Sequence, residues 1–124
     1  MKKVLIVEDN DKNMKLARDV LQNKGYKTLE AVTGEDGVRL AKENAPDLVL
    51  MDIQLPGING IEAFRQIRAD ARTARIPVVA LTASVTPTDR SAITAAGFDA
   101  FVGKPINLKE FLDTVKRLID GAKK

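Results

Sequence analysis

Short runs of apolar residues alternate with amphipathic stretches along the chain. The runs cover residues 4–7, 28–32, 48–51, 78–81 and 100–102, and most of their residues are Val, Ile, Leu or Ala. Near-continuous apolar runs of this kind are typical of strands in a parallel sheet that helices cover on both faces. The pattern therefore predicts five strands, mostly buried, in an α/β protein.

The stretches between the runs have the spacing of helices. In the first, Leu16, Ala17, Val20 and Leu21 form an apolar stripe, and Gly25 follows where a helix commonly ends. Further helices are expected over residues 34–43, 60–69 and 87–96, the last of them ended by Gly97. Each helix then connects two strands, as a parallel sheet requires.

The final helix has the clearest pattern of all. Asn107 and Glu110 resemble a capping box at its start, with Asn in place of Ser or Thr. Its core-facing positions recur at three and four residues, and they are Leu108, Phe111, Leu112, Val115, Leu118 and Ile119. Residues 121–124 are expected to fray.

The alternation of strands and helices continues without a repeat or a linker through 124 residues, of which 44% are hydrophobic. This length suits one globular domain, so we expect a single domain over residues 1–124. Five βα units favour a (βα)₅ flavodoxin-like fold, which is an α/β doubly wound parallel sheet with strand order 2-1-3-4-5.

Composition and charge narrow the possible chemistry. The chain has no Cys and no His, which excludes disulfides, His-based catalytic triads and typical Zn²⁺ sites. The net charge is +3, but Lys and Arg are spread over all helical segments and there is no Trp, so no nucleic-acid partner is expected. Neither a signal peptide nor a membrane span is apparent, which favours a soluble, cytoplasmic protein without a membrane partner.

Reactive side chains follow four of the predicted strands: Glu8 and Asp9, then Asp52, Thr82 and Lys104. Because ligands of an open α/β sheet bind outside the carboxyl ends of its strands, we expect these side chains at one site. The order places the first and third strands side by side, so Glu8, Asp9 and Asp52 would repel one another without a cation among them. Mg²⁺ suits such oxygen ligands.

A site of this composition fits phosphoryl transfer, which needs positioning and charge stabilisation around the transferred group. Asp52 would attack and become an acyl phosphate, while Mg²⁺, the Lys104 ammonium and the Thr82 hydroxyl or nearby N–H groups take its oxygens. A plainer reading is that the acids after the first strand cap the next helix and that Lys104 is a surface lysine. Their joint placement at strand ends favours the metal site.

Four motifs resemble those of the response-regulator receiver domain family. They are V-L-I-V-E-D-N from residue 4, D-L-V-L-M-D-I-Q-L-P-G-I-N-G from residue 47, V-V-A-L-T-A from residue 78 and V-G-K-P from residue 102. The sequences of these motifs are most similar to those of single-domain, CheY-like regulators of the DivK type and of receivers in hybrid histidine kinases. No output segment follows Ile119, so we expect a regulator without a DNA-binding output.

The resemblance implies a role for each candidate residue. Asp52 is implied as the phosphoacceptor, Lys104 as its countercharge, and Thr82 and Phe101 as the switch pair. The Mg²⁺ ligands are implied to be Glu8, Asp9, Asp52 and the backbone carbonyl of Gln54. The resemblance also implies a cis peptide bond between Lys104 and Pro105. Pro56, Gly57 and Gly60 are expected to shape the loop after the phosphoacceptor.

The same resemblance implies a signalling protein rather than an enzyme, one that catalyses only its own phosphorylation and dephosphorylation. A histidine kinase or histidine phosphotransfer protein would phosphorylate it, and a protein target would bind the fourth helix, fifth strand and fifth helix. Residues 88–95 and 109–117 are the candidates for contact with that target. The protein is expected to be a monomer or weak dimer. Three alternatives stay open: a haloacid-dehalogenase-type phosphatase, although Gln54 replaces its general acid; a flavodoxin-like FMN protein; and a constitutive interaction module.

Overall fold

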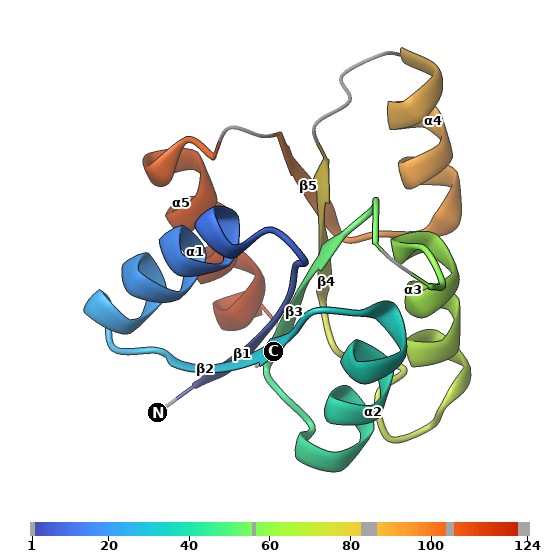
Figure 1. Cartoon of the computed structure of the whole chain (residues 1–124), viewed down its shortest axis with the longest axis horizontal. Helices are drawn as coiled ribbons and strands as arrows, with labels where there is room; N and C mark the ends of the chain where they lie inside the picture. The colour runs from blue at the N-terminus through green and yellow to red at the C-terminus, as the bar shows by residue number, and fades with distance from the viewer. Residues whose placement is uncertain (1, 56, 83–86, 104–105, 122–124) are drawn as a thin grey trace.

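The computed structural model describes residues 2–55, 57–82, 87–103 and 106–121, without the side chains of residues 87–90 and 121. The strands are β1 (Lys3–Val7), β2 (Lys27–Ala31), β3 (Leu48–Asp52), β4 (Val78–Thr82) and β5 (Ala100–Gly103). The helices are α1 (Asp11–Asn23), α2 (Gly34–Asn44), α3 (Gly60–Ala69), α4 (Pro87–Ala96) and α5 (Leu108–Gly121). Strands and helices therefore alternate along the described chain, as the apolar runs predict (Figure 1).

The strands form one sheet in the order β2-β1-β3-β4-β5, and every neighbouring pair is parallel. Helices α1 and α5 cover one face of this sheet, and α2, α3 and α4 lie on the other (Figure 1). The predicted flavodoxin-like α/β fold and its strand order are both confirmed. All five strands end at the same edge of the sheet, because parallel strands run in one direction.

Two hydrophobic cores lie on the two faces of the sheet, and alternate residues of each strand supply them. In β1, Val4 and Ile6 pack with α1 and α5, whereas Leu5 and Val7 pack on the side of α2 and α3. Leu48 and Leu50 of β3 likewise belong to the first core. The central strands are therefore buried on both faces, which explains their nearly unbroken apolar sequences.

Strand β2 departs from the expectation of general burial. Its residues Lys27 and Glu30 are exposed, because β2 lies at the edge of the sheet and pairs with β1 alone. Its bounds also differ by one residue from the predicted 28–32, and Val32 follows the strand with 51% of its surface exposed.

Two leucines predicted to face the core instead lie on the surface with a substantial part of each residue exposed. Leu16 of α1 is 37% exposed and Leu108 of α5 is 46% exposed. The buried stripe of α1 contains Met14, Ala17 and Leu21, and successive residues of a helix are about 100° apart, so Leu16 points away from it. Leu108 is the first residue of α5, beyond the part of the helix that packs on the sheet.

The end signals of the helices are confirmed. Gly25 has φ of +89° and Gly97 has φ of +101°, so each adopts the left-handed conformation that glycine tolerates after a helix. At the start of α5, the Glu110 N–H donates to Asn107 Oδ1 over 3.1 Å.

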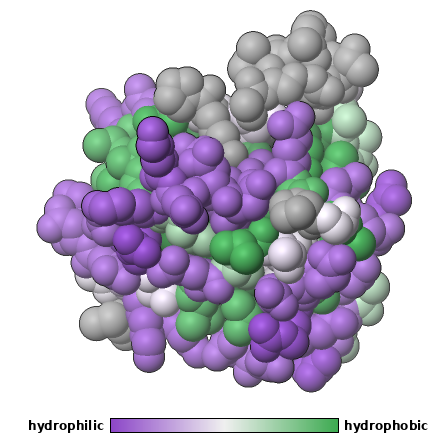
Figure 2. Space-filling view, viewed as in Figure 1, coloured by the Kyte–Doolittle hydropathy of each residue, from purple (hydrophilic) through white to green (hydrophobic). Residues whose placement is uncertain are grey.

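Hydrophilic residues cover most of the face seen in Figure 2. Among the described residues, every helix is too short or too polar to cross a membrane.

Candidate metal centre

The first acidic pair lies directly after β1. The Glu8 N–H donates to the Ala31 carbonyl over 2.9 Å, which extends the pairing of β1 with β2 by one residue. The Glu8 side chain is only 1% exposed, and its Oε2 accepts a hydrogen bond of 3.1 Å from the Asn10 N–H. Asn10 in turn caps α1 with its side chain. This cap was not among the residues singled out from the sequence, although Asn before a helical stripe is a known start signal.

Asp52 is the last residue of β3 and is 4% exposed. Its Oδ1 accepts a hydrogen bond of 3.1 Å from the Gln54 N–H, and the next peptide group is also fixed, since the Ile53 N–H donates to the Leu81 carbonyl over 3.1 Å. The carboxylate therefore projects from a backbone that pairing with β4 holds in place. Gln54 itself is exposed beside it.

The structure brings the three predicted acids together. Glu8, Asp9 and Asp52 each place a carboxylate oxygen within 4.8 Å of the other two. Mg²⁺ binds oxygen at about 2.0–2.1 Å, so ligands on opposite sides of the ion lie about 4 Å apart. A small inward shift of the carboxylates would therefore complete a set of hard oxygen ligands, and this composition fits a divalent cation such as Mg²⁺.

The predicted switch residues lie on the neighbouring strands. Thr82 ends β4 and is 5% exposed, and the β3–β4 register pairs Asp52 with Leu81, so Thr82 lies one position beyond it. In β5, Phe101 is partly buried and pairs with Ala80. Since Leu81 contributes to the core under α1 and α5, strand alternation places Thr82 on the opposite face of the sheet, toward α4.

Some predicted features lie outside the described residues. Lys104 and its peptide bond to Pro105, expected to be cis, belong to this group, and so does Pro56 in the loop after Asp52. The side chains of residues 88–90 in the expected partner-binding range are also outside the described part of the chain. The described strand β5 ends at Gly103, which pairs with Thr82.

Glycines define the loop between β3 and α3, as expected from the sequence. Gly57 has φ of +76°, and a Cβ atom on Gly60 would collide with the Asp52 carbonyl oxygen. Gly34, at the start of α2, packs against the same loop at Ile58. Before the structure, the one sign of this contact is a glycine at an early helical position, where other residues are better helix formers.

Comparisons with known proteins agree with this geometry. The family model of the response regulator receiver domain matches residues 4–116. The chain is 41% identical over 121 residues to the polar-differentiation response regulator DivK of Brucella ovis, which covers 98% of each chain.

Solved structures resemble this fold closely. The receiver domain of sensor histidine kinase PA1611 from Pseudomonas aeruginosa superimposes with a TM-score of 0.90 and 34% identity over 96% of this chain and 98% of that one, and it holds a magnesium ion in its active site cleft. The chemotaxis protein CheY4 of Vibrio cholerae gives a TM-score of 0.89 and 26% identity over 95% of this chain and 98% of that one.

Proposed function

Because the chain belongs to the response regulator receiver domain family, we propose that it accepts a phosphoryl group on Asp52 in a Mg²⁺-dependent reaction. The observation that carries this proposal is the placement of three carboxylates within 4.8 Å of one another at the carboxyl edge of the sheet. Phosphatase and flavin-protein alternatives lose support from the family match.

Asp52 is the nucleophile in this proposal. One of its oxygens forms a new O–P bond while the P–N bond of a donor phosphohistidine breaks, and the departing imidazole takes up a proton. The proposed ligands of Mg²⁺ are the carboxylates of Glu8, Asp9 and Asp52 with the Gln54 carbonyl. The ion supplies charge neutralisation between an anionic nucleophile and an anionic donor. The chain would catalyse only its own phosphorylation and dephosphorylation.

Thr82 and Lys104 are proposed to bind the oxygens of the new phosphoryl group. Phosphorylation adds about −1.5 to −2 charge and strong hydrogen-bond acceptors, which attract a hydroxyl and an ammonium. Thr82 would then move toward Asp52, and Phe101 would repack in the space on the α4 side of the sheet. Phe101 has no hydroxyl, so its contribution must come from packing.

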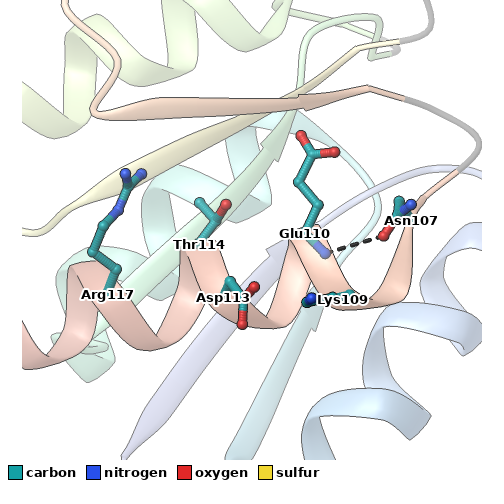
Figure 3. Close-up of a pocket in the computed structure, with 6 residues that line it drawn as sticks. All are labelled: Asn107, Lys109, Glu110, Asp113, Thr114 and Arg117. Carbon is teal, nitrogen blue, oxygen red and sulfur yellow. Dashed lines mark hydrogen bonds between the residues drawn. The ribbon is translucent and has the colours of Figure 1, made fainter.

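The proposed donor is a histidine kinase or a histidine phosphotransfer protein, and the proposed target binds α4, β5 and α5 in the cytoplasm. A shallow hollow of about 340 Å³ lies along α5 (Figure 3). It is lined by Asn107, Lys109, Glu110, Asp113, Thr114 and Arg117. Five of these residues fall in the expected range 109–117. Acidic and basic side chains are balanced in it, which suits a polar protein contact better than a strongly charged ligand. We propose that the protein works as a monomer or weak dimer.

Phosphorylation can be tested with acetyl phosphate. We expect intact-mass measurement to detect an adduct on the wild-type chain with Mg²⁺ present and little adduct with EDTA. Asp52→Asn should abolish the adduct, whereas Asp19→Asn, which removes an exposed carboxylate of α1 that pairs with Lys15, should leave it unchanged. An adduct of equal yield on Asp52→Asn would refute the assignment.

A further inference from the structure

The loop between β3 and α3 is hydrogen-bonded to β4 at its start and, at its end, to Ile53, the residue that follows Asp52. At its start, Ile53 donates to the Leu81 carbonyl over 3.1 Å, and at its end, Gly60 donates to the Ile53 carbonyl over 2.9 Å. Gly60 also approaches the Asp52 carbonyl so closely that a Cβ atom there would collide with it. A shift in the middle of this loop would therefore be transmitted to the peptide groups next to Asp52.

The first turn of α2 lies against the middle of the loop. Gly34 is buried, and a Cβ atom on it would lie 2.6 Å from Ile58 Cγ1 and 2.7 Å from the Ile58 carbonyl oxygen. The carboxylate of Glu35 occupies the space beside Gly57, where a Cβ atom would lie 2.6 Å from both of its oxygens. The contact with Ile58 involves backbone, so it cannot be relieved by rotating a side chain.

The same helix also contacts β1 just before the other acids of the site. A Cβ atom on Gly37 would lie 2.7 Å from Val7 Cγ2, and Val7 precedes Glu8 directly. Thr33 fixes the start of the helix, since its Oγ1 accepts a hydrogen bond of 3.1 Å from the Asp36 N–H. One turn of α2 thus packs against both segments that supply the carboxylate cluster.

We propose that Gly34 and Gly37 are positioning residues of the phosphorylation site, and that they hold the loop after Asp52 and the end of β1 at the separation that Mg²⁺ binding needs. This inference rests on the proposed function. In physical terms, the absence of side chains at these two positions lets α2 approach both segments. Glu35 fills the remaining space beside the loop, at an early position of α2 where an acid also suits the helix dipole.

The variant Gly34→Ala tests this proposal directly. Two quantities are measured: the Mg²⁺ dissociation constant, by NMR titration with Mg²⁺ alone, and the rate of labelling by acetyl phosphate. Changes to groups that support metal ligands typically weaken metal affinity by about 10–100-fold, and we expect an effect in that range. Labelling should slow at low Mg²⁺ and recover at saturating Mg²⁺, because the nucleophile itself is intact. Glu43→Ala, at the far end of α2, is the matched control and should leave both readings unchanged.

A second variant keeps the test decisive if Gly34→Ala folds poorly. Ile58→Ala removes the Cγ1 and Cδ1 atoms that a new Cβ atom would meet and leaves the carbonyl oxygen in place. The double variant Gly34→Ala with Ile58→Ala should therefore regain only part of the lost Mg²⁺ affinity. A folded Gly34→Ala protein with unchanged Mg²⁺ affinity would overturn the positioning role while leaving the proposed function intact. A wild-type chain that neither binds Mg²⁺ nor gains an adduct on Asp52 would overturn both.

Discussion

Replacing Asp52 with Asn should stabilise the folded protein when Mg²⁺ is absent. The carboxylates of Asp52 and buried Glu8 lie within 4.8 Å, so their repulsion is about 3 kcal/mol at an effective dielectric constant of about 20. Asp9 is exposed, and its repulsion of Asp52 at the same distance is about 1 kcal/mol in a water-like medium. Asn keeps an oxygen that can accept the hydrogen bond from Gln54.

These two terms sum to about 4 kcal/mol, and other charges and solvent screen the cluster and reduce this sum. We expect Asp52→Asn to raise the free energy of unfolding by about 1–3 kcal/mol in EDTA, measured by urea denaturation followed by far-UV circular dichroism. Mg²⁺ at about 100 times its dissociation constant should add about 2.7 kcal/mol to the wild type and less to the variant. A variant that is equally stable or less stable in EDTA would show that carboxylate repulsion at Asp52 does not outweigh its attraction to the countercharge proposed at Lys104. Glu43→Gln serves as the control for loss of an exposed charge.

Further predictions concern the core and the surface. Phe111→Ala removes a fully buried ring between the sheet and α5 and should cost about 3–5 kcal/mol of unfolding free energy by urea denaturation. Thr73→Val should cost about 1–3 kcal/mol in the same assay, because the buried Thr73 hydroxyl donates to the Ile67 carbonyl, which would lose its partner. The Arg72 side chain hydrogen-bonds Asp70 and lowers the pKa of that carboxyl to about 2, so NMR titration of Arg72→Ala should show this pKa raised toward 3.8. Since the folded-state pKa of Asp70 is lowered, its contribution to stability is present above about pH 4 and is lost as the pH falls toward 2.

The architecture could be predicted because its signals are local. Each apolar run is short and bounded, and the residues that end the strands are polar, so strand order alone was enough to bring Glu8, Asp9 and Asp52 to one edge. Exposure at the edge of the sheet was missed because Leu29 and Ala31 resemble a central strand, although Glu30 between them interrupts the apolar run.

The wrong orientation predicted for Leu16 and the unforeseen contacts of α2 both depend on long-range packing. Helical spacing alone is compatible with a buried stripe through Leu16 or through Met14. The packing of α1 on the sheet determines which of the two is buried. The contact between Gly34 and Ile58 joins residues far apart in the chain, and no local pattern marks either of them. Glycine at the start of α2 becomes informative only when the loop lies against it.

The two faces of the sheet constrain how a change at Asp52 could reach a partner. Strand alternation places Asp52 on the side of α1 and α5, continuing the row of Leu48 and Leu50, whereas Thr82 lies on the side of α4. The carboxyl ends of β3 and β4 are adjacent, and they are the shortest connection between the two sides. In the proposed function, a change at Asp52 therefore reaches α4 most directly over the end of β4, where Thr82 lies. We expect Thr82→Ala to weaken the coupling to α4 and to leave Mg²⁺ binding by the three carboxylates in place.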